Sequence, residues 1–319
     1  MQSALALDPQ LVEVIVVDDG STDSTGELVD NLAEGRRNCL VVHQENAGRS
    51  RARNLGLSVA RSPWITFLDA DDIFITLPDP SLFLKQDYQS IWCGYLTNGD
   101  NPVLPRLDAG PLPVVESTSL LLSTVIDVNS PQGPNENGFD GTLERTVWAT
   151  FYSKERLIAL GQAFDPSLAY AEDLELNIRF LCSTSRYLAL PLVTYDYREE
   201  DSGTMKSFDR SNLDDLMHFC SVIQRDLASV RSQAHISPLI GNEVIQQIRR
   251  AGRFGTLKDV QSVCACIRSQ KILLEGLKDY SPPQPRRRLL AKMRMIFIKC
   301  HLDIGIRLME QILNNLKNS

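Results

Sequence analysis

The segment Thr66–Asp72 places three carboxylates, Asp69, Asp71 and Asp72, at the end of an apolar run. Like charges this close repel one another, so a site with a purely structural role rarely collects them. Carboxylate oxygens are the ligands that Mg²⁺ and Mn²⁺ prefer, and a divalent cation would remove the repulsion. If the chain is extended here, Asp69 and Asp71 point to one side and Asp72 to the other. The alternative is a helix N-terminus, where acidic side chains suit the helix dipole.

A second acidic pair, Asp18 and Asp19, follows a β-branched apolar run at residues 13–17 that is typical of a strand. The residues after the pair are rich in types that form turns and cap helices. They predict a helix whose first residues are capped by Ser24 or Thr25.

Strands and helices alternate in this first part of the chain. Strands are predicted at residues 13–17, 40–42 and 64–68, with a helix in each interval, the second running to about residue 60. This order predicts a parallel sheet with crossover helices, and such sheets bind ligands at the carboxyl ends of their strands. Both acidic clusters lie at such ends. Three arginines that could neutralise phosphate groups follow the second strand: Arg49, Arg51 and Arg53.

A third acidic pair consists of Glu172 and Asp173. Leu174, Ile178 and Leu181 repeat at helical spacing, so the pair lies at the start of a predicted amphipathic helix. Acidic residues in a first helical turn can serve only to stabilise the helix dipole. Residue types alone therefore leave open whether this pair takes part in a reaction or only stabilises the helix.

Three blocks of the sequence resemble a known family. They are Val-Val-Asp-Asp-Gly-Ser-Thr-Asp at 16–23, Asn-x-Gly-x-x-x-Ala-Arg-Asn-x-Gly at 46–56 and Phe-Leu-Asp-Ala-Asp-Asp at 67–72. Each block alone is a weak signal, but their order and spacing together resemble family 2 of the inverting glycosyltransferases, which have the GT-A fold. The resemblance is strong over residues 11–75 and returns at residues 165–205.

The resemblance implies a role for each matching residue. The implied roles are nucleotide contact for Asp18, Asp19 and Ser21, lining of the diphosphate for Asn46, Gly48 and Arg53, and metal and diphosphate binding for Asp69 and Asp71. The implied cofactor is Mn²⁺ or Mg²⁺, which would stabilise the leaving nucleoside diphosphate. Alternatively, Asp19 caps the turn and Arg51 lies on a solvated helix face.

The later part of the resemblance concerns the proposed base. Glu172 and Asp173 match a Glu-Asp motif in which the Asp takes the proton of the acceptor hydroxyl, with the Glu orienting its neighbours. The residues from Tyr195 to Arg198 resemble the strand and loop that follow the base helix. Arg198 would then close over the diphosphate, although an exposed arginine beside acidic residues is the alternative.

The implied activity is metal-dependent transfer of a sugar from a nucleotide sugar to a hydroxyl, with inversion of configuration. The resemblance to this family implies that the donor is a UDP-sugar and that the acceptor is a glycan or a lipid-linked molecule. The implied product is a surface polysaccharide or a glycolipid. We expect no nucleic-acid partner, and the sequence leaves open whether the protein forms a homo-oligomer. One alternative is a non-catalytic binding or scaffold protein on the same fold. Another is a receiver-like signalling domain that uses Asp18, Asp19 and Asp69, which would leave Asp173 unexplained.

The composition indicates a protein with a sizeable core, since 43% of the 319 residues are hydrophobic. Seven cysteines are scattered without disulfide or zinc spacing, and the first residues lack the pattern of a signal peptide. No apolar run reaches the ~20 residues of a transmembrane helix. These features predict a cytoplasmic protein.

Two domains are expected. Residues 1–204 should form an α/β domain of the GT-A type, with a Rossmann-like, mostly parallel sheet flanked by helices, and residues 205–319 a helical region. The first part has a net charge of −16 and the second of +9. A basic second half suggests an anionic partner.

The end of the chain is predicted to be a basic amphipathic helix. Three arginines at 286–288 precede apolar residues expected on one helical face, which are Leu289, Met293, Ile296, Cys300 and Ile304. Residues 286–319 can therefore lie on the anionic inner face of a membrane. The alternative is a helix that packs on the core or on a partner subunit.

Two further expectations concern the start and the middle of the chain. The family normally begins with a strand, a loop and a helix, and residues 1–10 can supply only the end of that helix. The sheet is then expected to expose an apolar edge beside residues 14–17. A loop at residues 130–140 is a candidate for acceptor contact. The aromatic residues after it are expected in the core: Trp148, Phe151 and Tyr152.

Overall fold

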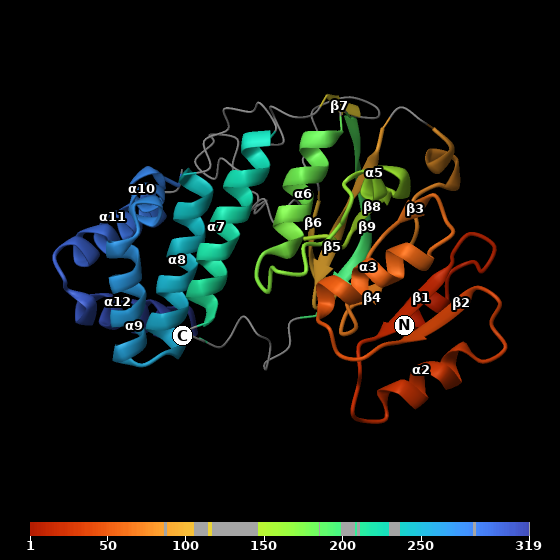
Figure 1. Cartoon of the computed structure of the whole chain (residues 1–319), viewed down its shortest axis with the longest axis horizontal. Coiled ribbons are helices and arrows are strands. Elements are labelled where there is room, and N and C mark those ends of the chain that lie inside the picture. Colours follow the sequence, from red (N-terminus) through yellow and green to blue (C-terminus); the bar gives the residue numbers. More distant parts are fainter. Residues whose placement is uncertain are drawn as a thin grey trace. The chain divides into compact units, whose positions relative to one another are not determined.

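The computed structural model describes only part of the chain, namely residues 1–85, 88–104, 114–116, 146–184, 186–198, 208, 211–229, 237–282 and 285–318. The described residues up to 198 form one compact unit, and those from 208 onward form a second. In Figure 1 the first unit runs from red to green and the second from turquoise to blue. The predicted acceptor loop at residues 130–140 lies outside the described residues.

The first acidic pair follows a small parallel sheet. β1 (Val14–Asp18) pairs in parallel with β2 (Cys39–His43), and α2 (Thr25–Ala33) is the crossover between them. Ser24 occupies the N-cap position of α2, but its side chain makes no capping hydrogen bond, and the Thr25 N–H instead donates to Asp23 at 2.9 Å. The predicted strand–helix–strand arrangement is thus confirmed for this part of the chain.

The helix after β2 closes over β1. α3 (Arg49–Val59) packs against β1, and a Cβ atom added at Gly56 would lie 3.4 Å from the Val17 side chain. Within the described residues, β1 pairs with no strand other than β2. Its second edge therefore has no described strand beside it, but residues 14–17 are buried or half-buried, so the predicted exposure of this apolar edge is not observed.

Within the described residues, the larger sheet of the first unit has seven strands and mixed pairing. Its main path runs β3-β8-β5-β9-β4, with β6 beside β5 and β7 beside β9. Only β5 and β9 pair in parallel, so the sheet is mixed where a mostly parallel one was expected, although the predicted α/β class is confirmed. The strands are β3 (Trp64–Ile65), β4 (Ile73–Phe74), β5 (Ser90–Thr97), β6 (Asp100–Val103), β7 (Val114–Glu116), β8 (Thr150–Ser153) and β9 (Arg186–Tyr197).

The third predicted strand is shorter than expected and belongs to the other sheet. β3 ends at Ile65 and pairs antiparallel with β8, so it does not extend the sheet of β1 and β2. Aromatic packing accompanies this placement, because the Trp64 ring lies 5.5 Å from the Phe83 ring, which itself lies 5.4 Å from the Phe151 ring of β8. The Trp64 indole N–H also donates to the Phe83 carbonyl at 2.9 Å. Residues 66–69 continue as irregular chain toward the acidic cluster.

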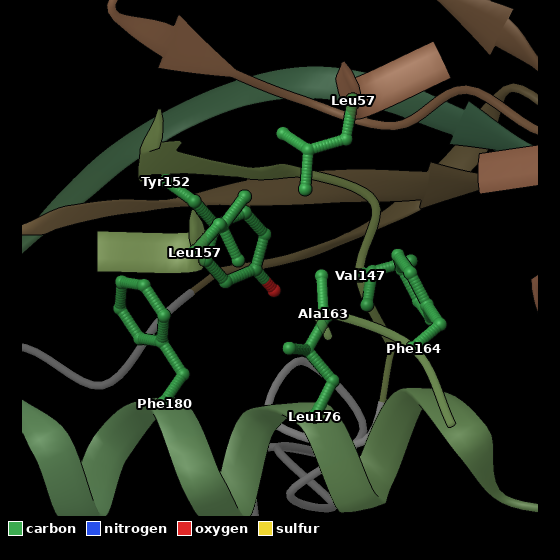
Figure 2. Packing of buried hydrophobic residues seen from close by; sticks show 8 residues of the cluster. All are labelled: Leu57, Val147, Tyr152, Leu157, Ala163, Phe164, Leu176 and Phe180. Atoms are coloured by element: carbon green, nitrogen blue, oxygen red, sulfur yellow. The ribbon is translucent and has the colours of Figure 1, made fainter. Parts of the chain in front are cut away.

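One hydrophobic cluster ties α3 and β8 to the two helices that follow, α5 (Lys154–Ala159) and α6 (Glu172–Ser183). Figure 2 shows Leu176 and Phe180 rising from α6 toward Tyr152 and Leu157. The cluster contains Leu57, Val147, Tyr152, Leu157, Ala163, Phe164, Leu176 and Phe180. Because α6 carries the third acidic pair, this packing fixes the pair relative to α3.

A second hydrophobic cluster lies around Phe74, Ile91 and Phe151, which belong to β4, β5 and β8 of the larger sheet. The short helices α1 (Gln2–Leu5) and η1 (Pro80–Leu84) complete the first unit. The predicted core aromatics are buried, since Trp148, Phe151 and Tyr152 are 6%, 3% and 0% exposed.

The second unit is helical throughout its described residues, as the sequence predicts. Its elements are α7 (Ser211–Ser229), α8 (Ser237–Phe254), α9 (Leu257–Ser269), α10 (Lys271–Asp279), α11 (Pro285–Lys299) and α12 (Asp303–Asn318). α8 packs against α7, α9, α10 and α12 (Figure 1). Two glycines allow the closest of these contacts, because a Cβ atom at Gly241 would lie 2.1 Å from the Gly276 carbonyl oxygen.

The basic end of the chain forms two helices where one was expected. α11 ends at Lys299 and α12 begins at Asp303, so the predicted continuous apolar face from Leu289 to Ile304 is wrong. His301 lies between them with φ 57°, a left-handed conformation that continues neither helix. Arg268 of α9 holds the start of α12 through Asp303 at 2.9 Å. No described helix is both long enough and apolar enough to cross a bilayer.

Candidate active site

Asp18 ends β1 and is fixed by the groups around it. Its Oδ1 accepts a hydrogen bond from the Ser21 N–H at 3.0 Å, and its Oδ2 lies 2.8 Å from Nδ1 of His43. The other ring nitrogen of His43 lies 3.0 Å from the Asp30 carboxylate. Hydrogen bonds from Ser21 and His43 lower the pKa of Asp18 to about 2, and the two carboxylates raise the pKa of His43. Asp18 is therefore an anion held in one orientation.

Asp19 fastens the end of β1 to the loop that precedes α3. Its carboxylate accepts hydrogen bonds from Gln44 Nε2 at 2.6 Å, Ala47 N at 2.8 Å and Gly48 N at 2.9 Å. Burial raises the pKa of Asp19, but these hydrogen bonds outweigh it and hold the pKa below its usual range. The sequence left a local turn-capping role open, and the observed contacts instead reach across 25 to 29 residues.

The loop that carries Asn46 lies directly against the turn after β1. A Cβ atom on Gly20 would lie 2.7 Å from the Asn46 nitrogen, and Gly20 has φ +77°. A side chain at position 20 would therefore be strained and would push the two loops apart. The blocks predicted to contact the nucleotide and the diphosphate are thus adjacent.

The Asp69–Asp72 segment forms a turn and not the extended end that the sequence suggested. The Asp72 N–H donates to the Asp69 carbonyl at 3.2 Å, so side-chain alternation does not apply here. Asp71 is exposed, the Asp69 side chain is 37% exposed, and Asp72 is buried. The turn therefore presents Asp69 and Asp71 and turns Asp72 inward.

Asp72 anchors the end of β9. Its Oδ2 accepts from the Tyr195 hydroxyl at 2.6 Å and its Oδ1 from the Arg198 N–H at 2.7 Å. The same hydroxyl accepts from the Asp69 N–H at 3.2 Å. The Arg198 guanidinium pairs with Asp196 at 2.7 Å, so in this structure Arg198 has an acidic partner at the end of β9. Its predicted contact with a diphosphate stays a prediction.

The third acidic pair begins a helix, as its sequence predicts. Glu172 and Asp173 are the first residues of α6, directly after Ala171. Ala171 has φ 57°, a left-handed conformation that costs free energy for a non-glycine residue. Strain of this kind is concentrated at functional sites. Glu172 is buried, whereas the Asp173 side chain is 18% exposed.

Arg53 joins the predicted base to the predicted metal-binding turn. Its Nη1 lies 2.6 Å from Asp173 Oδ1 and 3.2 Å from Glu172 Oε1, and its Nη2 lies 2.8 Å from Asp69 Oδ1. The guanidinium carbon also lies 5.2 Å from the centre of the Phe164 ring. One side chain from α3 thus collects carboxylates that lie 16 to 120 residues away in sequence.

Arg49, one helical turn before Arg53, makes a second link. Its Nε lies 2.6 Å from Glu172 Oε1, and its Nη2 donates to the Ala169 carbonyl at 2.8 Å. Arg51 is exposed, which agrees with a solvated helix face. A chain of contacts therefore connects the residues predicted to bind the nucleotide to the start of α6, through Asp19, Gly48, Arg49 and Glu172.

The electrostatics of the site suit proton transfer near neutral pH. Burial raises the pKa of Asp173 to about 7, and the Arg53 charge opposes that rise while Glu172 and Asp69 add to it. Burial also raises the pKa of Asp72 to about 6. Carboxyl groups with such perturbed pKa values are typical of functional sites.

The residues present fit a divalent cation only in part. Asp69 and Asp71 offer exposed or half-exposed carboxylate oxygens, but one oxygen of Asp69 is bonded to Arg53. The described residues contain no cluster of three or more His, Cys, Asp or Glu side chains able to hold a metal. Mg²⁺ is commonly bound by one or two protein carboxylates, with phosphate oxygens and water molecules as its remaining ligands. The donor set is therefore suited to a metal that arrives with a diphosphate.

Sequence reasoning missed several residues of this site. It gave no role to His43, which contacts Asp18, and it missed that Tyr195 bonds to Asp72 and that Arg49, named only as a phosphate contact, holds Glu172. His43 ends β2 beside Asp18, so the parallel pairing of β1 and β2 could have suggested that contact. No local sequence signal joins Tyr195 to Asp72, which lie 123 residues apart.

The first unit has the GT-A fold of glycosyltransferases. Residues 1–349 of Staphylococcus aureus TarS, solved in complex with UDP-GlcNAc, match 98% of this chain and 85% of that chain, with a TM-score of 0.62 at 18% identity. At this level of identity the likeness establishes the fold, and it sets the receiver-like alternative aside.

Residues 1–87 match the model of glycosyl transferase family 2. The uncharacterized glycosyltransferase EpsJ of Bacillus subtilis is 27% identical over 195 residues, covering 59% of this chain and 53% of EpsJ. The succinoglycan biosynthesis protein ExoU of Rhizobium meliloti is 44% identical over 195 residues, covering 58% of this chain and 53% of ExoU. The chain thus spans about half the length of these two relatives. The resemblance predicted from the sequence blocks is confirmed over residues 1–87.

Proposed function

We propose that this chain transfers a sugar from a UDP-sugar to a hydroxyl of a glycan or lipid-linked acceptor, with inversion at the anomeric carbon. Mn²⁺ or Mg²⁺ is the proposed cofactor, and surface polysaccharide or glycolipid the proposed product. The proposal draws support from the family of residues 1–87 and from the name of the relative ExoU in succinoglycan biosynthesis. The structure of TarS with UDP-GlcNAc supports a UDP-sugar donor.

The contact of Arg53 with both Asp173 and Asp69 is the observation that carries this proposal. The two carboxylates lie within 2.6 and 2.8 Å of one guanidinium, so the proposed base and the proposed metal-binding turn face the same small volume. A donor bound at the turn would place its anomeric carbon close to the base. Proximity of this kind accounts for a large share of catalytic rate.

The proposed reaction is a single displacement. Asp173 accepts the proton of the acceptor hydroxyl, and the acceptor oxygen attacks the anomeric carbon from the face opposite the diphosphate. The bond between that carbon and the phosphate oxygen breaks, and UDP leaves with the bonding electrons. A divalent cation bound with the diphosphate would neutralise negative charge on the leaving group. Asp71 and Asp69 are its proposed ligands.

Other residues of the site hold the donor and the base in place. We assign nucleotide contact to Asp18, Asp19 and Ser21, and the diphosphate side to Asn46 and Gly48. The backbone N–H groups that precede α3 suit anions, although that of Gly48 bonds to Asp19 here. Arg53 and Arg198 bear positive charges suited to the diphosphate, each now paired with carboxylates that a phosphate would replace.

The product of the reaction tests this proposal directly. The full chain would be incubated with UDP-sugars, Mn²⁺ and a panel of glycan and lipid-linked acceptors, and the product's anomeric configuration read by nuclear magnetic resonance. We expect a β-linked product from an α-linked donor. A product that keeps the donor's configuration would contradict the assignment of Asp173. Tight UDP-sugar binding with no turnover of any acceptor would favour the alternative, a non-catalytic binding protein on this fold.

The reaction should depend on pH through Asp173. Only the carboxylate form accepts a proton, and its pKa is raised to about 7, so kcat/KM should fall as the pH drops below about 7 and level off above it. Arg53, Arg49, Glu172 and Asp69 are the charges that face this group. The measurement is kcat/KM from pH 5.5 to 9 at saturating Mn²⁺. A profile that is flat through this range would contradict the role of Asp173.

His43 should matter through Asp18. In His43→Ala the Asp18 carboxylate loses its 2.8 Å partner, so we expect UDP affinity to fall roughly three- to tenfold, the usual effect of one lost hydrogen bond. Asp30→Ala removes only the outer partner of His43 and serves as the matched control. Both affinities would be measured by calorimetry. Equal losses in the two variants would argue against a specific role for the His43–Asp18 contact.

A further inference from the structure

α12 exposes an apolar stripe on the face opposite the one that it buries. Ile306 is fully buried against the helical unit, as is Glu310 one turn later. Ile304, Leu308 and Ile312 are 59%, 54% and 59% exposed. Their spacing of four residues places them along one side of the helix.

α11 leaves a second apolar stripe uncovered. Leu289 and Ile296 are 60% and 52% exposed and lie seven residues apart, which places them on the same side of the helix. Leu302, in the short connection to α12, is 50% exposed. The two helices pack against each other, and a Cβ atom on Gly305 of α12 would lie 3.3 Å from the Phe297 ring of α11. They are drawn in the darkest blues in Figure 1.

The same helices carry a surplus of positive charge. Residues 285–318 contain eight Lys and Arg against two Asp and Glu. Both acidic residues have basic partners inside the unit, since Glu310 pairs with Arg294 and Asp303 pairs with Arg268. The exposed basic side chains of α11 include Arg286, Arg287, Lys292 and Lys299.

The positive charge continues onto α8. Burial lowers the pKa of Arg249, and the charges of Arg253, Arg294 and Arg287 lower it further. Arg253 of α8 and Arg294 of α11 both pair with Glu310 of α12, at 3.8 and 2.7 Å, so α8 and α11 lie close together at this point. We call the combined feature the α11–α12 surface. It comprises the apolar residues Leu289, Ile296, Leu302, Ile304, Leu308 and Ile312 and the basic residues Arg286, Arg287, Lys292 and Lys299.

We propose that the α11–α12 surface docks on the headgroup region of an anionic lipid bilayer, with its apolar side chains entering the acyl boundary and its basic side chains meeting lipid phosphates. Helices that combine exposed apolar stripes with Lys and Arg bind such surfaces. A second copy of this chain is a poorer occupant, because facing copies would bring surplus positive charges together. This inference goes beyond sugar transfer and does not depend on it.

The test is flotation of the purified full chain with lipid vesicles. Neutral phosphatidylcholine vesicles would be compared with vesicles containing phosphatidylglycerol, at 50 mM and 500 mM NaCl. We expect binding to the anionic vesicles only, with most of it lost at the higher salt concentration. Equal binding to neutral vesicles, or no binding to either kind, would overturn the proposal.

Two variants separate the charged from the apolar contribution. The triple variant Arg286→Glu, Arg287→Glu, Lys292→Glu should lower the vesicle partition coefficient by about 100-fold or more, since each basic residue near the surface adds roughly fivefold. The triple variant Ile304→Asp, Leu308→Asp, Ile312→Asp should lower it at least about tenfold. These side chains are exposed, so circular dichroism should report unchanged folding.

Matched controls come from the first unit. Leu84 is 83% exposed and Arg37 is exposed, so Leu84→Asp and Arg37→Glu change the same residue types elsewhere. We expect both to partition within twofold of the unchanged protein. Losses equal to those of the triple variants would overturn the assignment to this surface. Light scattering would measure the oligomeric state of the unchanged protein and of the triple variant at Ile304, Leu308 and Ile312. If the unchanged protein were a dimer and the triple variant a monomer, the surface would mediate self-association, and the membrane-docking proposal would be overturned.

Discussion

Replacing Asp173 with Asn is expected to lower kcat about 10²- to 10⁴-fold, the usual contribution of a general base, while UDP affinity stays within a few-fold of the unchanged protein. Asn has nearly the same shape but cannot accept the acceptor proton. Arg53 keeps its contacts with Asp69 and Glu172, so the donor side of the site should remain in place. The measurement is steady-state transfer beside calorimetric UDP binding.

The control for Asp173→Asn must remove a charge from a first helical turn without touching the site. Glu155 lies in the first turn of α5 and is exposed, so Glu155→Gln isolates the helix-dipole effect that the sequence left open for Asp173. We expect this variant to transfer sugar at the unchanged rate. If Asp173→Asn were as active as Glu155→Gln, Asp173 would be a structural residue and the base would lie elsewhere.

Asp71→Ala is expected to lower the Mn²⁺-dependent transfer rate by at least about 100-fold, since a bound metal contributes several kcal/mol to stabilising the leaving group. Asp71 is exposed at the turn, so the substitution should leave the fold intact. The rate would be measured over a range of Mn²⁺ concentrations. A variant that loses a metal ligand should need much more Mn²⁺ or show no response to it.

Glu27→Ala provides the charge-matched control, because Glu27 is exposed on α2. It should respond to Mn²⁺ as the unchanged protein does. Asp71→Ala with an unaltered Mn²⁺ dependence would remove Asp71 from the metal site. Asp69 alone could not then be assigned as the ligand, because one of its oxygens is bonded to Arg53.

Local sequence signals predicted the elements that carry the chemistry. The β-branched run at residues 14–17 is β1, α2 begins at Thr25 directly after the turn-forming residues, and Glu172 begins α6. These signals succeed because strand burial, helix capping and helical periodicity each act over only a few residues. The acidic pairs therefore lie at the ends of the elements that the sequence predicted.

Contacts between segments that lie far apart in the chain could not be predicted from the sequence. The burial of Asp72 against Tyr195 depends on how β9 crosses the sheet, and the sequence offers no local sign of that crossing. The same holds for Trp64, which begins β3 beside β8 and packs on Phe83. The break between α11 and α12 at His301 was also missed, because the apolar periodicity continues through it.

Calorimetric titration of UDP into this 319-residue chain, with and without Mn²⁺, tests the central claim most directly. That claim is a single site in which the Asp69–Asp72 turn and the start of α6 act on one nucleotide sugar. We predict clear UDP binding with Mn²⁺, and binding at least about tenfold weaker without it, since the metal links the carboxylates to the diphosphate. UDP binding of equal strength in both conditions, or none in either, would contradict the account.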